Sequence, residues 1–123
     1  MVYASSKVQI VDNSGVRLVR CIKVLGKSNP RALGRVGNLI VCSVLRALPR
    51  RKIKVHDICR CIIIRQRRKV QRLNGMTVSF YKSAAVVVDA RRQPIANRIK
   101  GSTMSELRKR RHMKIISLAS SLI

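Results

Sequence analysis

Acidic side chains, aromatic side chains and long apolar runs are all scarce in this sequence. Four carboxylates stand against 28 lysines and arginines, for a net charge of +24, and so few acids leave little material for a catalytic pair of carboxylates. No apolar run approaches the ~18 residues of a membrane-spanning helix, and the basic stretches lack the apolar face of a helix that lies on a lipid surface. We therefore expect no enzymatic activity and no membrane partner.

The shortage of aromatic residues excludes a further class of protein. Tyr3, Phe80 and Tyr81 are the aromatic residues, and tryptophan is missing, which disfavours readers of single-stranded nucleic acid that stack bases on aromatic rings. The hydrophobic fraction of 46% still supports a core built from aliphatic side chains. A length of 123 residues predicts one compact domain, residues 1–123.

Positive charge is the strongest signal that is present. Such an excess of one sign destabilises an isolated compact domain by self-repulsion, and a bound polyanion removes that repulsion with release of counterions. Arginine outnumbers lysine, and its planar guanidinium suits bidentate contact with phosphate. Residues 46–72 hold eleven basic residues and residues 91–114 hold nine, whereas residues 73–90 hold only Lys82. We therefore predict two RNA-facing surfaces that recognise the backbone of folded RNA.

Alternation of polar and apolar residues predicts a mainly β protein. The expected strands are 7–11, 17–25, 38–48, 58–67, 77–81 and 84–89. Asn74-Gly75 is a strong signal for a hairpin turn. The segments 12–15, 26–37 and 50–56 predict a turn and two basic loops. This pattern of five or more short strands predicts a small closed β-barrel with an extended hairpin over residues 1–92.

Residues 93–123 show a different pattern, which predicts a loop and two short helices. Thr103-Met104-Ser105-Glu106 fits a capping box at the start of the first helix. A second helix is predicted from the helical spacing of four apolar residues, Ile115, Leu118, Ala119 and Leu122.

Four cysteines raise the alternative of a metal site. His56, Cys59 and Cys61 lie close in sequence, but Cys-x-Cys is not the usual zinc knuckle and a second knuckle is missing. On a strand, Cys59 and Cys61 share one face, where small apolar side chains suit a core. We therefore expect core cysteines, with no metal and no cofactor. Residues 1–15 carry one basic residue, Lys7, and no signal-peptide core, so we also expect no targeting segment.

At this point the sequence resembles a known family, the L-fourteen family of large-subunit ribosomal proteins, of the bacterial and organellar type. The resemblance covers nearly the whole chain and is carried by residues 11–15 (VDNSG), 21–26 (CIKVLG), 62–64 (III), 74–75 (NG) with Phe80, 86–87 (VV), and 113–119 (MKIISLA). It implies a five-stranded barrel with two small C-terminal helices.

The resemblance also implies partners. Family members bind large-subunit rRNA at the face that meets the small subunit, contribute to intersubunit bridges with small-subunit rRNA, and pair with a neighbouring large-subunit ribosomal protein. They also dock the ribosomal silencing factor, through positions that correspond to Asn97, Arg98 and Lys114. Asn97 departs from the usual Thr, and Ala96, Lys100 and Ser102 depart from the family pattern in the same loop.

Two sets of contact residues follow from these arguments. For rRNA phosphates we predict Lys23, Lys27, Arg31, Arg35, Arg50, Arg51, Lys52, Lys54, Arg65, Arg67, Arg68, Lys69 and Arg72. For protein and intersubunit contacts we predict Asn97, Arg98, Lys100, Arg108 and Lys114.

Location and a second function complete the predictions. The net charge looks high for the family, which favours the mitochondrial matrix and its ribosome, with plastid or bacterial cytoplasm as alternatives. A free-standing non-specific RNA-binding barrel or RNA chaperone is the alternative function, because it would share the salt-sensitive binding without one stable partner.

Overall fold

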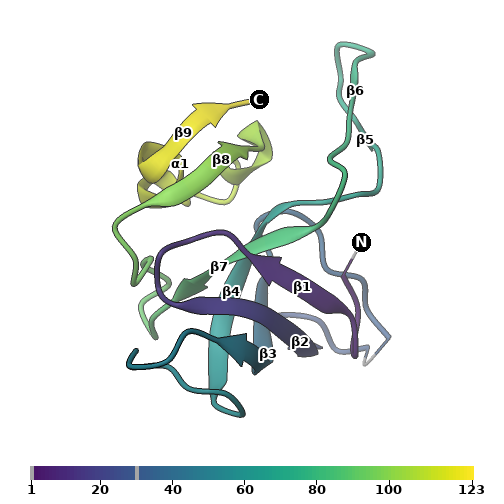
Figure 1. Cartoon of the computed structure of the whole chain (residues 1–123). Coiled ribbons are helices and arrows are strands. Elements are labelled where there is room, and N and C mark those ends of the chain that lie inside the picture. Colours follow the sequence, from purple (N-terminus) through teal and green to yellow (C-terminus); the bar gives the residue numbers. More distant parts are fainter. Residues whose placement is uncertain (1, 30) are drawn as a thin grey trace.

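The computed structural model describes residues 2–29 and 31–123 and is built mainly from strands (Figure 1). Five strands close into a barrel in the order β1-β2-β3-β4-β7. Their bounds are β1 Lys7–Ile10, β2 Val16–Val24, β3 Leu39–Ala47, β4 Ile58–Arg65 and β7 Ala84–Val88. Neighbouring strands are antiparallel except β1 and β7, which close the barrel in parallel. The predicted fold class is confirmed.

Alternation along the strands explains why they form this wall. In β1 and in β3 as far as Val44, every second side chain is buried, and the residues between are exposed or half-buried. Two strands depart from that rule, because residues 61–64 of β4 and all of β7 are buried on both faces. Strands buried on both faces read as continuous apolar runs. Their outer faces must therefore be covered by another part of the chain.

A hairpin projects from the barrel between β4 and β7 (Figure 1). It contains β5 Val70–Gln71 and β6 Thr77–Val78. Gly75 has φ +85°, and the amide N–H of Met76 donates to Asn74 Oδ1 over 3.1 Å. The Asn-Gly turn is thus where the sequence predicts it, although the second arm pairs over two residues instead of 77–81.

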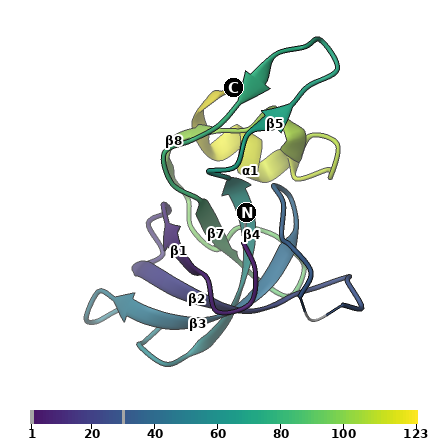
Figure 2. The same cartoon turned by 90° about the vertical axis from the view of Figure 1, so that its right-hand side faces the viewer.

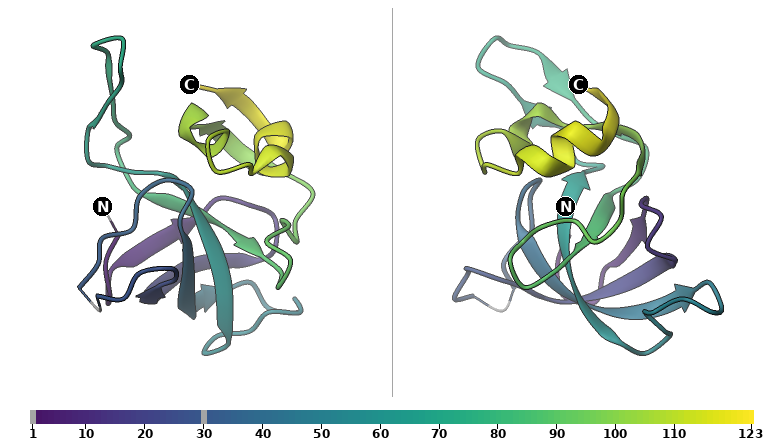
Figure 3. Two further views of the ribbon diagram at one scale, coloured as in Figure 1. Left: turned by 180° about the vertical axis from the view of Figure 1, so that it is seen from behind. Right: turned by 90° about the vertical axis from the view of Figure 1, so that its left-hand side faces the viewer.

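The C-terminal part of the chain forms a separate layer beside the hairpin, which we call the C-terminal module (residues 99–123). It contains β8 Ile99–Thr103, the 3-10 helix η1 Ser105–Leu107, the helix α1 Met113–Leu118 and β9 Ala119–Leu122. β8 and β9 pair in parallel. Seen from three sides, the module and the hairpin rise from the same end of the barrel (Figures 1, 2 and 3).

The two predicted short helices are present as η1 and α1, but the module differs from the sequence prediction in three details. Two strands, β8 and β9, were not predicted at all. Thr103 ends β8 instead of capping a helix, and its buried Oγ1 has no hydrogen-bond partner. The 3-10 helix begins after Met104 without a side-chain cap. The second helix ends at Leu118, because Ala119 turns to extended angles (φ −74°, ψ 148°) and starts β9.

Contacts between barrel and module explain the doubly buried strands. Ile99, Met104, Leu107 and Ile115 are buried in one cluster with the residues of β4 and β7. Arg65, at the end of β4, donates through its guanidinium to the carbonyl oxygens of Lys100 and Ser102. Burial of that guanidinium lowers the pKa of Arg65. The module therefore completes the core of the barrel.

Candidate nucleic-acid interface

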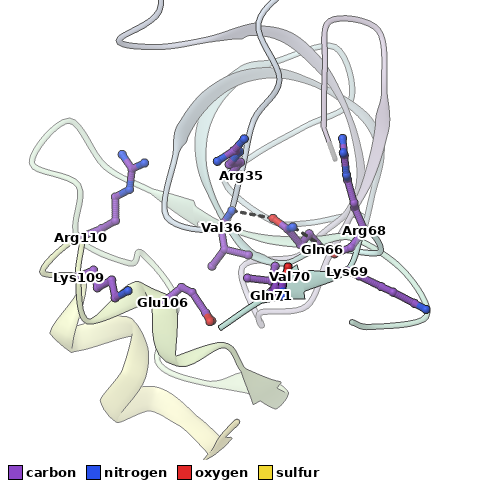
Figure 4. Close-up of a pocket in the computed structure, with 10 residues that line it drawn as sticks. All are labelled: Arg35, Val36, Gln66, Arg68, Lys69, Val70, Gln71, Glu106, Lys109 and Arg110. Atoms are coloured by element: carbon purple, nitrogen blue, oxygen red, sulfur yellow. Dashed lines mark hydrogen bonds between the residues drawn. The ribbon is translucent and has the colours of Figure 1, made fainter. Parts of the chain in front are cut away.

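The largest gathering of predicted basic residues lines a surface hollow of about 440 Å³ (Figure 4). Three segments form it: the loop before β3, the stem of the β5–β6 hairpin, and the segment after η1. Its cations are Arg35, Arg68, Lys69, Lys109 and Arg110, and all five residues are exposed. We call this hollow the cationic cradle. Phosphate oxygens suit such a site, because five positive groups surround one opening.

One buried amide holds two sides of the cradle together. Gln66 is 4% exposed, its Oε1 accepts from the amide of Val36 over 3.2 Å, and its Nε2 donates to the carbonyl of Arg68 over 3.1 Å. These two bonds, drawn in Figure 4, join the loop before β3 to the hairpin stem. On the loop side, the amide of Arg35 donates to Asn38 Oδ1 over 2.8 Å. The spacing of the cations is therefore set by the backbone.

Glu106 is an acid among the lining residues, but its charge is already paired. Its Oε1 accepts from Arg72 Nε over 2.8 Å. Burial raises the pKa of Glu106, but the hydrogen bond from Arg72 lowers it, and the pKa lies below its usual value. Arg72 also donates to the carbonyl oxygen of Ile123 over 2.7 Å. The ion pair joins hairpin to module and leaves the field of the cradle positive.

A second cationic hollow of about 500 Å³ lies where the hairpin returns to the barrel wall. It is lined by exposed cations of β1, β2, β3 and the segments beside the hairpin: Lys7, Arg17, Arg46, Arg67 and Lys82. Tyr81 stands among them with 87% of its surface exposed, and Lys82 Nζ lies 5.7 Å from the centre of its ring.

A third hollow continues from the cradle, because Arg110 lines both. It lies between residues 91–94 and residues 110–115, and its cations are Arg91, Arg92, Arg110, Arg111 and Lys114. The ring of His112 fixes this side of the module, with Nε2 3.0 Å from the carbonyl oxygen of Gly37. The cradle and the third hollow thus form one continuous basic surface.

The predicted rRNA contacts therefore fall into three groups. Arg35, Arg67, Arg68 and Lys69 lie in the first two hollows. Arg65 and Arg72 make contacts within the chain. The remaining seven are exposed on loops and on β2, at Lys23, Lys27, Arg31, Arg50, Arg51, Lys52 and Lys54.

The predicted protein contacts all carry exposed side chains in or just before the C-terminal module. The amides of Asn97 and Arg98 donate to Asn13 Oδ1 over 3.2 and 3.3 Å, so the turn after β1 holds this segment. Lys100 lies in β8, Arg108 follows η1, and Lys114 lies in α1.

Sequence reasoning missed cations that the fold adds to these surfaces. Lys109 and Arg110 complete the cradle, and Lys7, Arg17 and Arg46 complete the second hollow. The density of basic residues between 91 and 114 pointed toward the first pair. Nothing in the sequence brings β1, β2 and β3 beside Arg67, because that neighbourhood depends on closure of the barrel.

Metal ligands and membrane-spanning helices are two further features for which the described part of the chain can be compared with the sequence predictions. There, no group of three or more His, Cys, Asp or Glu residues could hold a metal ion. Likewise, no helix in those ranges has both the length and the apolar character to cross a membrane. The core placement of the cysteines is confirmed for Cys21, Cys42 and Cys61, which are buried, while Cys59 is half-buried.

The sequence matches a known protein family. The family model described as Ribosomal protein L14p/L23e matches residues 1–123. The match thus extends over the barrel, the hairpin and the C-terminal module alike.

Proposed function

Because this chain belongs to the ribosomal protein L14p/L23e family, we propose that its cationic cradle holds the phosphate backbone of large-subunit rRNA. Membership makes the chain a structural component of the large ribosomal subunit, with rRNA and ribosomal proteins as partners and no enzymatic activity. Family membership favours a role in the ribosome over that of a free-standing RNA-binding barrel or RNA chaperone.

The observation that carries the proposal is the convergence of five cations from three segments on one hollow. With the second and third hollows, the cradle forms a basic surface on the hairpin, the module and the adjoining barrel wall. A basic surface of this extent suits the nearly continuous row of phosphates of an RNA backbone better than it suits a small anion. Among the thirteen predicted contacts, Arg65 and Arg72 are weak candidates, because their guanidinium groups donate to acceptors within the chain.

Charge reversal at matched places tests the cradle. In the double variant Lys109→Glu/Arg110→Glu, the cradle loses two of its cations. The control Arg20→Glu/Arg60→Glu makes the same change of charge at exposed positions on the barrel wall. We expect the first variant to leave the large subunit in a high-salt gradient with magnesium, while the control stays bound. Equal retention of both variants would refute the assignment of the cradle.

We further propose that the C-terminal module meets the small subunit. The support is the exposure of Asn97, Arg98, Lys100, Arg108 and Lys114 in and just before the module, together with the family resemblance. These residues would contact small-subunit rRNA in an intersubunit bridge and would dock the ribosomal silencing factor. Arg98→Glu/Arg108→Glu should then reduce subunit joining at low magnesium without releasing the protein from the large subunit. Unchanged joining would count against the bridge.

The hairpin tip is our candidate contact for a neighbouring large-subunit protein. Leu73 is fully exposed and Met76 is 56% exposed at the end of a projecting hairpin. Apolar side chains placed this way gain stability when a partner covers them. Crosslinks from a photoreactive residue at position 73 should reach a ribosomal protein; crosslinks to RNA alone would contradict this contact.

Residues 1–123 would act as one domain in this assembly, which is supported by the core that barrel and module share.

For location we propose the mitochondrial ribosome, supported by the unusually large charge of +24. Fractionation against a matrix marker tests this, since recovery with plastid or bacterial cytoplasmic ribosomes would replace it.

A further inference from the structure

The cysteines form a row across three neighbouring barrel strands, away from any role in RNA contact. Cys21 lies in β2, Cys42 in β3, and Cys59 and Cys61 in β4. In the strand register, Cys42 faces Cys21 on one side and Cys59 on the other. Three of the four are at most 1% exposed. Chance placement of four thiols in 123 residues does not favour such a row.

Contacts between the sulfur atoms connect the row. Cys59 Sγ lies 3.8 Å from Cys61 Sγ on the same face of β4. Hydrogen bonds from Cys21 and Cys61 lower the pKa of Cys42 to about 5, against the effect of burial. The same bonds, with burial, raise the pKa of Cys21 and of Cys61. The strand register places Cys42 opposite both Cys21 and Cys59, and Cys61 contacts Cys59, so the four thiols form one contiguous group.

Cys21 and Cys42, the pair at the inner end of the cysteine row, have a geometry that suits a disulfide. The amide and carbonyl of Cys21 bond to Ser6 and Ser5, over 2.8 and 2.7 Å, and so point away from β3. Cys21 and Cys42 are thus a non-hydrogen-bonded antiparallel pair, whose Cα atoms lie ~4.5 Å apart, within the range that a disulfide spans. Cys59 and Cys61 are two residues apart on one strand, ~6.6 Å, at the far end of that range.

Cys59, at the outer end of the cysteine row, is open to small molecules. Cys59 is half-buried and lines a hollow of about 550 Å³ with Ile53, Arg60 and Val87 among its neighbours. An oxidant therefore meets Cys59 before it can meet the three sealed thiols.

We propose that the four cysteines form a redox relay, in which a peroxide oxidises Cys59 and the oxidation passes inward to end as a disulfide between Cys21 and Cys42. This relay is independent of the proposed rRNA contacts. Its substrate class is hydrogen peroxide or a small organic hydroperoxide, and its product is a covalent bond between β2 and β3.

Each step balances. The Cys59 thiol attacks one peroxide oxygen, the O–O bond breaks, and a sulfenic acid forms while water, or an alcohol, leaves with the thiol proton. The Cys61 thiol then displaces the sulfenic hydroxyl as water and forms a Cys59–Cys61 disulfide. Cys42, which faces Cys59 in the strand register, attacks Cys59 and releases Cys61 as a thiol; Cys21 attacks Cys42 and releases Cys59 as a thiol. In sum, two thiols lose two electrons, and the peroxide gains them.

Disulfide mapping of the purified full-length chain tests the relay. The reduced protein is treated with a limited dose of hydrogen peroxide, its remaining thiols are alkylated under denaturing conditions, and peptides are identified by mass spectrometry without reduction. We expect a Cys21–Cys42 disulfide with Cys59 and Cys61 alkylated. In Cys59→Ser, the same disulfide should form at least about ten-fold more slowly. Equal rates in the two proteins would overturn the proposal, and so would a sulfinic acid at Cys59 with Cys21 and Cys42 reduced.

A second measurement needs no substitution and therefore no refolded variant. Iodoacetamide added to the folded wild-type protein should modify Cys59 first. Protein alkylated at Cys59 should then resist peroxide, as Cys59→Ser does. Modification of Cys21, Cys42 or Cys61 before Cys59 would overturn the proposed entry point.

Discussion

Arg65 and Arg67 stand two residues apart, yet the structure gives them opposite surroundings, and this difference can be measured. The guanidinium of Arg65 donates to two carbonyl oxygens of β8 and lies 5.6 Å from the centre of the Phe80 ring. Arg67 is exposed in the second hollow. We therefore expect Arg65→Met to weaken the fold and Arg67→Met to weaken RNA binding.

The expected magnitudes follow from these contacts. A hydrogen bond from a charged group contributes about 1.5–3 kcal/mol, and a cation–π contact about 0.5–1 kcal/mol. One of the two bonds of Arg65 is exposed, so it counts little, and Met keeps the apolar stem in place. Arg65→Met should lower the free energy of unfolding by about 3 kcal/mol in total. Arg67→Met should lower it by less than ~0.5 kcal/mol, as surface substitutions usually do.

Two titrations separate the roles. Urea unfolding gives stability, and binding to a short RNA duplex at several salt concentrations gives the slope of log K against log salt. Each lost phosphate contact reduces that slope by about 0.7–0.9. We expect this reduction for Arg67→Met and an unchanged slope for Arg65→Met. If Arg65→Met reduces the slope and leaves stability intact, Arg65 binds phosphate and the argument from its internal contacts fails.

Three further predictions concern the free energy of unfolding, each measured by urea or thermal unfolding. Gly34→Ala places a Cβ 2.8 Å from Ile63 Cδ1 and should lower the free energy of unfolding by about 2 kcal/mol. Gly26→Ala meets open space but has φ +78°, so it should lower that free energy by ~1 kcal/mol. Equal losses would contradict the packing argument. Asp12→Ala removes the acceptor of a buried β7 amide and should cost about 2 kcal/mol; a loss under ~0.5 kcal/mol would refute that role. The lowered pKa of Glu106 means that its ion pair stabilises the fold at neutral pH, and that this contribution is lost as pH falls through the folded-state pKa. Glu106→Gln should therefore reduce the pH dependence of the melting temperature between about pH 6 and pH 3. An unchanged pH profile would exclude the effect.

Local pattern was enough to predict the barrel. Alternation along β1 and the first six residues of β3 requires one buried face and therefore a wall around a core. The Asn74-Gly75 turn was predictable because its residues tolerate the left-handed conformation. The family resemblance agrees with both.

Local pattern did not predict the two strands of the C-terminal module, for a physical reason. Thr103 and Glu106 match a capping box locally, but Thr103 pairs with Leu122 in a parallel ladder. Glu106 contacts Arg72, 34 residues away. Contacts between distant segments outweighed a local preference for helix, and no short window of sequence records them.

The candidate site shows the same division. The density of basic residues predicted that Arg68 and Lys69 contact an anionic partner, and the basic loop 26–37 predicted the same of Arg35. It could not show that Arg110 joins them, because the cradle depends on where the chain turns after η1. Charge is readable from composition, but the shape of a charged surface depends on tertiary contacts.

The parallel pairing of β1 with β7 has a consequence for synthesis of the protein. A ribosome that has made residues 1–83 has produced four strands of the wall but not the strand that closes it. Such an intermediate leaves two edges with unpaired backbone groups, and long-range closure of this kind is slow. Folding of the nascent chain therefore waits for β7 to emerge, and a chaperone that covers open strand edges would act in that interval.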